Sequence, residues 1–350
     1  MKTISIHFFF LIMSLGLGIL FPALGQESDF SMYQYTTVLT NPGMEAGEEQ
    51  IQVGVNYRHQ FLEVGKDIRT SLLTVTCPIR YNENRLVVVT SFLDDESANQ
   101  LVTTGGLLGV AYGVRLNARS TLNLGMQVGF FQRKAGGRFT TEEQFVNGVF
   151  DPNIPSSDAV LGNRVNYPTL SQGLYWEIKD REGRDQAFIG VSTFNSSRPN
   201  VSMTREKDRL PLTLKTMAGY SFYPDMRFSI SPTVRWVHAA GNNQLNIGSR
   251  VAYLLDPGSS KQVGMGLWYD TNRLAVVSLE YRSEAYTIAA SSDIPLSGTL
   301  SSVQRGIMEL ALYYRFKNEG ITIAPKQRSG KTKTPKMKDQ WKIQKRNRKE

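Results

Sequence analysis

Residues 50–61 read QIQVGVNYRHQF, and this stretch decides the fold of the chain. Its odd positions carry Ile, Val, Val, Tyr, His and Phe, whereas its even positions carry Gln, Gln, Gly, Asn, Arg and Gln. Side chains of a β-strand point alternately to its two faces, so the segment predicts a strand with one apolar face and one polar face. In a soluble sandwich the apolar face points to the protein core, and in a membrane barrel it points outward to lipid. The rest of the sequence distinguishes the two.

The bulk composition excludes a helical membrane protein. The chain has 350 residues, of which 41% are hydrophobic, and it is long enough for one large β-domain or two smaller ones. After the N-terminus no run approaches the roughly 18 apolar residues that a spanning helix needs. A transmembrane barrel escapes that test, because only every second residue of its strands has to be apolar.

Residues 1–25 have the pattern of a cleavable signal peptide. Lys2 precedes an almost entirely apolar run over residues 4–20, and small residues then precede Gln26, the expected new N-terminus. The alternative is a single anchoring helix. We therefore expect an exported protein, with residues 26–49 forming an N-terminal periplasmic segment.

Residues that could carry chemistry are few. Cys77 is the single cysteine, so no intrachain disulfide is possible. His59 and His238 have no partner at metal-ligand spacing, and no nucleophile elbow or phosphate-binding glycine loop occurs. We expect no cofactor, no metal and no enzymatic activity, although an outer-wall lipase built around one of these histidines stays an open alternative.

The alternating pattern recurs often enough to build a closed barrel over residues 50–316. Most of the segments are about 9 to 13 residues long, which is the length that a tilted strand needs to cross a bilayer. An even number of strands is typical of bacterial outer-membrane barrels. We count 14 candidate strands, which start near residues 50, 67, 85, 105, 121, 167, 186, 211, 227, 244, 261, 273, 284 and 304.

The connections between these segments fall into two classes. Short ones follow the even-numbered segments, and long ones follow only odd-numbered segments, which is the asymmetry of a barrel whose termini lie in the periplasm. The short connections span residues 80–84, 117–120, 180–185, 223–226 and 256–260, and the long ones span 94–104, 134–166, 196–209 and 292–303.

This sorting answers the question that residues 50–61 raise. The sequence predicts an all-β, transmembrane antiparallel β-barrel in the outer membrane, with its apolar face in contact with lipid and its polar face lining the lumen. Glycines such as Gly125 alternate with lipid-facing residues and should thin the lumenal side. An arginine should be costly at Val128 and tolerated at the neighbouring, lumenal Gln127.

All of the net charge belongs to a basic C-terminal tail, residues 317–350. The tail holds 12 Lys and Arg against three acids, which gives +9 and equals the net charge of the whole chain. It is either a solvated extension or a periplasmic arm that binds an anionic partner, and nucleic acid lies in the wrong compartment. The candidate partner-binding residues are Lys331, Lys333, Lys336, Lys338, Lys342, Lys345, Arg346 and Arg348.

Two N-terminal motifs and the first strand resemble one family. The run DFSMYQY (residues 29–35), the turn at Asn41-Pro42-Gly43 and the strand ending YRHQF (57–61) are similar to the opening of PorP/SprF proteins of the type IX secretion and gliding machinery. The resemblance continues to the closing run ELALYYRF (309–316). The Asn-Pro-Ala-Tyr turn of the family is replaced here, and the basic tail is additional.

The resemblance implies a 14-stranded barrel that is not an enzyme. Such a protein supports export or surface attachment of secreted proteins with a sorting domain. It docks them to the type IX translocon and to periplasmic components that are linked to peptidoglycan. The alternative function that the sequence leaves open is a transport channel for small solutes.

Overall fold

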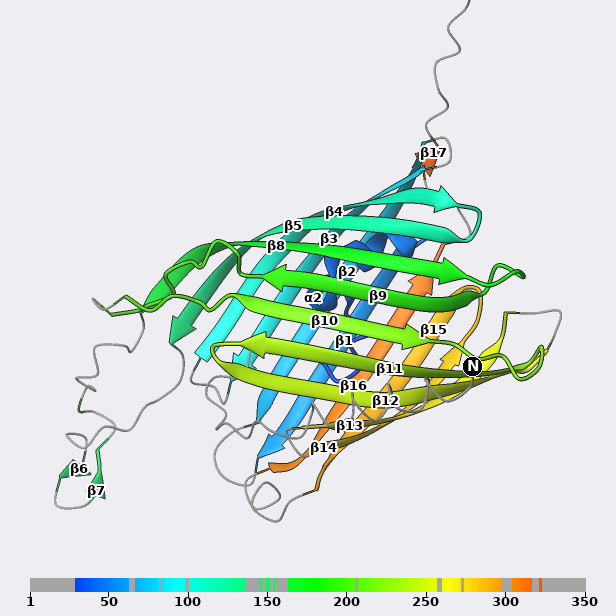
Figure 1. Cartoon of the computed structure of the whole chain (residues 1–350). Helices are drawn as coiled ribbons and strands as arrows, with labels where there is room; N and C mark the ends of the chain where they lie inside the picture. Colours follow the sequence, from blue (N-terminus) through cyan, green and yellow to red (C-terminus); the bar gives the residue numbers. More distant parts are fainter. Residues whose placement is uncertain are drawn as a thin grey trace, which may run out of the picture.

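The computed structural model describes residues 29–62, 67–81, 84–97, 101–135, 145–146, 149–151, 154, 163–204, 207–256, 260–271, 274–296, 304–316 and 321–322. Within these residues, 14 strands form one closed antiparallel barrel (Figure 1). The barrel closes because β1 pairs with β2 on one side and with β16 on the other. The predicted signal peptide and nearly all of the basic tail lie outside the described residues.

The predicted strands are confirmed, and none starts more than four residues from its expected position. The largest difference is at β4, which was expected from residue 105 and begins at Leu101. The barrel strands are β1 (Gln52–Leu62), β2 (Ile68–Tyr81), β3 (Asn84–Ser97), β4 (Leu101–Asn117), β5 (Ser120–Ala135), β8 (Arg164–Lys179), β9 (Asp185–Phe194), β10 (Thr213–Tyr220), β11 (Phe228–Ala239), β12 (Asn242–Leu254), β13 (Gln262–Asp270), β14 (Leu274–Arg282), β15 (Tyr286–Pro295) and β16 (Gln304–Arg315).

The apolar face of the strands points outward, as expected. Val55 is 43% exposed and Val128 is 52% exposed, whereas the adjacent Asn56 and Gln127 are 1% and 4% exposed. The polar side chains therefore point into the barrel, and they are covered there. A barrel with an apolar outer wall suits a bilayer, and the covered lumen raises the question of what fills it.

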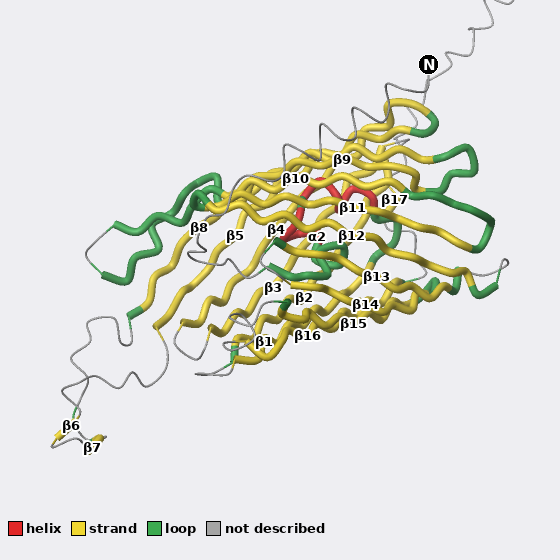
Figure 2. The backbone as a smooth tube through the Cα atoms, turned by 60° about the horizontal axis from the view of Figure 1, so that its bottom comes forward, coloured by secondary structure: helices red, strands yellow, loops and turns green. Residues whose placement is uncertain are grey.

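Residues 29–49, which we call the lumenal segment, lie in the lumen and contact the inner faces of the strands. The segment contains a short helix, α2 (Thr37–Thr40), and a 3₁₀ helix, η1 (Pro42–Gly47). Both lie within the ring of strands in Figures 1 and 2. The sequence predicted an N-terminal periplasmic segment over residues 26–49, and the structure places residues 29–49 of it inside the barrel. No helix in the described part of the chain is long and apolar enough to span a membrane.

The connections define two different rims. The short-turn rim carries the turns that follow β2, β4, β8, β10, β12 and β14, and the opposite, long-loop rim carries the segments 136–163, 195–212 and 296–303. The long loop expected over residues 94–104 is wrong, because β3 and β4 pair up to Ser97 and Leu101. Another connection on the long-loop rim is a tight turn, in which Ala240 and Gly241 have φ values of 51° and 81°.

Two elements extend the barrel at its rims. The connection 136–163 holds a small hairpin, β6 (Phe145–Val146) paired with β7 (Val149–Phe150). At the short-turn rim, β17 (Ile321–Thr322) pairs in parallel with the end of β2. The chain therefore reaches the short-turn rim again just before the remainder of the tail.

At the long-loop rim, the connection 195–212 packs against the inner face of the barrel. In the connection 195–212, the backbone N–H of Val201 donates to Asp208 and that of Leu210 donates to Pro199, which folds the loop on itself. Val201 is buried in one apolar cluster with Phe131 and Tyr167, which are on the inner face of β5 and β8. Because Phe30 belongs to the same cluster, this loop and the lumenal segment share one core.

Candidate functional site

The first residue of the lumenal segment is held by two buried cations. Asp29 lies 2.8 Å from Nη1 of Arg235 on β11 and 3.5 Å from Nζ of Lys215 on β10. Lys215 also donates to the carbonyl oxygen of Leu39 at 2.8 Å, and the guanidinium of Arg235 lies 4.6 Å from the ring centre of Tyr33. An unpaired buried charge is costly, so Asp29 and the two cations require one another.

The next two residues hold a carboxylate through the backbone. The N–H groups of Ser31 and Met32 each donate to Glu309 on β16 at 2.8 Å. Glu309 also forms an ion pair with Arg58 on β1 at 3.2 Å, and the Ser31 hydroxyl donates to Asp293 on β15. Glu309 thus links the lumenal segment to the seam where the barrel closes.

Tyrosines continue this series of contacts. The Tyr35 hydroxyl donates to Glu280 of β14 at 2.5 Å, and Glu280 is paired with Arg250 of β12. The Tyr33 hydroxyl lies 2.7 Å from that of Thr233 on β11. The DFSMYQY run therefore attaches the segment to β10, β11, β14, β15 and β16 of the barrel wall.

The turn at Asn41 is seated against glycines. The Asn41 side chain accepts from the N–H of Gly43 at 2.8 Å, and its Nδ2 donates to the carbonyl oxygens of Leu174 at 3.0 Å and Val191 at 3.3 Å. A Cβ on Gly125 would lie 2.2 Å from the carbonyl carbon of Pro42, and one on Gly173 would lie 2.0 Å from Oδ1 of Asn41.

Gly125, Gly173 and Gly190 form what we call the glycine cradle on the inner face of β5, β8 and β9. In all three, an added Cβ would be closer than 3.0 Å to the Asn41–Gly43 turn. The sequence analysis predicted that Gly125 makes the lumenal side of the wall thin, and this contact explains why the position needs a glycine. The wall is thin because the lumenal segment packs directly on the strand backbone, an approach that only glycine allows.

The end of the segment is fixed near the short-turn rim. Arg85 of β3 donates to the carbonyl oxygens of Ala46 at 3.2 Å and Gly47 at 2.7 Å. Earlier in the segment, the side chain of Gln127 on β5 donates to the carbonyl oxygen of Val38 at 2.9 Å, and the hydroxyl of Ser192 on β9 donates to that of Thr40 at 2.8 Å. The barrel wall thus satisfies backbone carbonyls that a buried, largely irregular segment would otherwise leave unpaired.

The two histidines among the described residues lie near strand ends and contact neighbours on the same strand or at the start of the next. His59 contacts Asp67 at 2.9 Å and the ring of Phe61, and His238 contacts Asn243 at 2.9 Å. Within the described part of the chain there is no group of three His, Cys, Asp or Glu side chains that could hold a metal ion.

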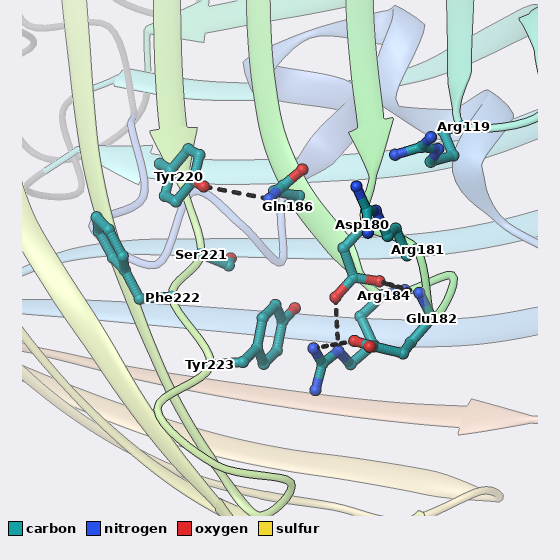
Figure 3. Close-up of a pocket in the computed structure, with 10 residues that line it drawn as sticks. All are labelled: Arg119, Asp180, Arg181, Glu182, Arg184, Gln186, Tyr220, Ser221, Phe222 and Tyr223. Carbon is teal, nitrogen blue, oxygen red and sulfur yellow. Dashed lines mark hydrogen bonds and ion pairs between the residues drawn. The ribbon is translucent and has the colours of Figure 1, made fainter.

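A small cavity at the short-turn rim is the other polar site (Figure 3). It has a volume of about 380 Å³. Arg184 pairs with Asp180 at 2.7 Å and lies 4.0 Å from the ring centre of Tyr223. Desolvation raises the pKa of the Asp180 carboxyl, but the hydrogen bonds from Arg184 prevail and the pKa lies below its ordinary value. The lining residues are Arg119, Asp180, Arg181, Glu182, Arg184, Gln186, Tyr220, Ser221, Phe222 and Tyr223.

The site residues expected from the sequence lie elsewhere. Lys331, Lys333, Lys336, Lys338, Lys342, Lys345, Arg346 and Arg348 are outside the described residues. The sequence did not predict that the lumenal contacts form a site. It did single out the DFSMYQY run and the Asn41 turn as motifs. Buried charges on the polar face of strands, such as Arg58, Arg235 and Glu309, are the signal that could have indicated an occupied lumen.

Solved structures similar to this chain are outer-membrane barrels. The CymD monoaromatic hydrocarbon channel is 10% identical, with 84% of this chain and 96% of that chain covered and a TM-score of 0.48. A FadL homologue from Pseudomonas aeruginosa is 11% identical, covering 81% and 94%, with a TM-score of 0.43. A deltaS2 mutant of the TodX monoaromatic hydrocarbon channel is 8% identical, covering 81% and 94%, with a TM-score of 0.50.

The likeness to the TodX channel mutant shows the fold alone. No individual curated protein shows a significant match to the sequence. A family model does match, over residues 23–314, and it describes the type IX secretion system membrane protein PorP/SprF. The match includes the lumenal segment and 13 complete barrel strands with nearly all of β16. The chain therefore belongs to the PorP/SprF family of type IX secretion system membrane proteins and is a multi-pass β-barrel of the outer membrane.

Proposed function

We propose that this protein acts by binding, as a membrane-embedded adaptor of the type IX secretion and gliding machinery. In this role it docks a secreted protein with a sorting domain to the translocon and to peptidoglycan-linked components in the periplasm. Support comes from the family, which is one of secretion rather than of an enzyme class.

The observation that carries the proposal is the occupied lumen. A channel needs a continuous path, whereas here residues 29–49 lie across the interior and are bonded to β1, β3, β5, β8, β9, β10, β11, β14, β15 and β16 through side chains or carbonyl groups. The polar inner face of the barrel is used for these contacts. This supports a binding role over the alternative of a small-solute channel.

The orientation follows from the two rims. Barrels of the outer membrane have short periplasmic turns and longer extracellular loops, so the long-loop rim should be extracellular and the short-turn rim periplasmic. The secreted partner would then meet segments 136–163 and 195–212, and the basic tail would extend into the periplasm. An epitope beside Asp151 should be labelled by antibody on intact cells and one after Lys338 should not; the reverse pattern would refute this orientation.

The tail supplies a second contact in this proposal. Its lysines and arginines, among them Lys331 and Arg348, would attract peptidoglycan or an acidic periplasmic protein, and the attraction should weaken as salt screens it. The remainder of the chain is neutral, so this charge is available to a partner without changing the barrel.

The function is tested in a strain that lacks the chain. Surface display of the sorting-domain partner should be lost and restored by the wild-type gene, and the purified protein should carry translocon subunits with it after cross-linking. Normal surface display in the deletion strain, together with no cross-linked secretion component, would contradict the adaptor role.

A further inference from the structure

The long-loop rim carries a group of exposed cations, which we call the cationic rim. It is formed by Lys134 at the end of β5, Arg164 at the start of β8, and Arg198, Lys207 and Arg209 in the connection 195–212. Within the described part of the chain, none of these five side chains is paired with an acid. The chain outside the basic tail has no net charge, so the excess of positive charge at this rim is local.

Two of these cations face each other across a pair of strands. Lys134 and Arg164 are register partners on β5 and β8, and both residues are exposed. Like charges directly opposite each other in a sheet are destabilising, and an acid at either position would make the pair favourable. The rim therefore contains an unfavourable interaction that an anion bound from outside would relieve.

The loop cations are held over the same end of β8 (Figures 1 and 2). Asn163, which precedes Arg164, donates from its side chain to the carbonyl oxygen of Met203 in the connection 195–212 at 3.1 Å. In that connection Asn195 and Arg198 have φ values of 57° and 44°, in a backbone region that favours glycine. Residues fixed in this region by the surrounding structure are frequent at binding sites. The cationic rim thus joins the bases of connections 136–163 and 195–212.

The cationic rim lies above the apolar band of the wall. On the outer face of β5, Phe130 is the last apolar residue, and Gln132 and Lys134 follow it. Gln132 donates to Asn166 of β8 at 2.9 Å, so a pair of amides separates the aromatic ring from the cations. A strand rises about 3.4 Å per residue and tilts by about 40°, which places Lys134 about 10 Å above Phe130 along the membrane normal. The headgroup layer is about 5 to 7 Å thick, so the cations lie beyond it.

We infer that the cationic rim is the surface that binds the secreted partner, through an acidic region of that protein. Guanidinium groups pair with carboxylates in a two-pronged geometry, and several exposed cations together steer a negatively charged partner to the surface. The inference rests on the proposed function and its orientation of the two rims, and it adds the chemistry of the contact. A lipid phosphate is the competing anion, and the height of the cations above the apolar band argues against it.

Arg164→Glu provides a variant in which loss of binding and loss of folding are separated. It replaces the like-charge pair with Lys134 by an opposite-charge pair, so the heat-dependent gel mobility of the variant should show a folded barrel with a melting temperature equal to or above that of wild type. Any loss of binding is then a loss of the surface charge.

The binding test uses a fluorescent octaglutamate peptide on intact cells, because the peptide reaches the long-loop rim from outside and the basic tail is shielded by the membrane. Cells with the wild-type protein should bind more peptide than the deletion strain, and the excess should vanish at high salt. The double variant Arg164→Glu/Arg198→Glu should lower this excess roughly 3- to 10-fold, the worth of two or more exposed ion pairs. Surface display of the secreted partner should fall in the same variant.

Arg119→Glu is the matched control, because Arg119 is an exposed cation in the turn between β4 and β5 at the opposite rim. It should bind the peptide and display the partner as wild type does. Equal peptide binding or equal display by wild type and the double variant would overturn the inference, as would an equal loss in Arg119→Glu. A photo-cross-linker at Lys134 that captures lipopolysaccharide instead of protein would also overturn it. Peptide binding needs no translocon, so its failure is separate from a failure of the adaptor role in the deletion strain.

Discussion

At the scale of single residues, glycine is decisive where the lumenal segment meets the wall. Gly125→Ala would place a Cβ within 2.2 Å of the Pro42 backbone, whereas the nearest atom to a Cβ at Gly106 would be the Ser91 carbonyl oxygen at 3.6 Å. We expect Gly125→Ala to destabilise the barrel by about 1 to 3 kcal/mol, as overpacking does, and Gly106→Ala to be close to neutral. Urea unfolding followed by gel mobility measures both. Equal stabilities for the two variants would argue against the glycine cradle.

The two faces of β5 give a second prediction. Val128→Arg should cost about 2 to 4 kcal/mol, because it places a charge on the lipid face. The sequence alone suggested that arginine would be tolerated at Gln127, but Gln127 is buried and donates to Val38 O at 2.9 Å. Gln127→Arg should therefore also destabilise, and Gln127→Ala should cost about 1 to 3 kcal/mol by leaving that carbonyl unsatisfied. A neutral Gln127→Ala in the same unfolding assay would show that Val38 is not held there.

At the scale of elements, strands were predictable and the lumenal segment was not. A strand can be predicted from local sequence, because residues such as Val53, Val55 and Tyr57 alternate with polar residues regardless of which strands lie next to them. The place of residues 29–49 depends on partners far away in the chain: Asp29 bonds Lys215, 186 residues on, and Ser31 bonds Glu309, 278 residues on. No periodicity encodes such contacts. The shorter connection at residues 98–100 was missed because Asp94, Asp95 and Glu96 are polar yet belong to β3.

The tail is the element whose role can be separated from the fold. Because Ile321 and Thr322 pair with β2 as β17, a truncation should begin at residue 323 rather than remove this strand. Deletion of residues 323–350 should leave a folded barrel, and the periplasmic partners should no longer co-purify. With the intact tail they should dissociate at high salt. If the truncated protein keeps the same partners at the same salt, the tail is a solvated extension and not a binding arm.

At the scale of the whole molecule, the charges inside the barrel and the lumenal segment form one system. Asp29 and Glu309 are each paired with a buried cation, and their partners sit on strands from opposite parts of the sheet, β10 and β11 for the first and β1 for the second. Breaking a buried pair typically costs about 3 to 5 kcal/mol. An Asp29→Ala change should loosen the segment, whereas Asp185→Ala, which removes a largely exposed contact with Lys179, should cost about 0 to 1 kcal/mol.

The central claim is that this barrel works by binding while its own N-terminal segment occupies the lumen. Ion conductance of the purified wild-type protein in planar lipid bilayers tests it most directly, with Asp29→Ala as the variant in which the segment is loosened. The claim predicts no steady pore current for wild type and an increased frequency of current steps for Asp29→Ala. A stable, single-valued pore conductance in wild type, unchanged by Asp29→Ala, would contradict it.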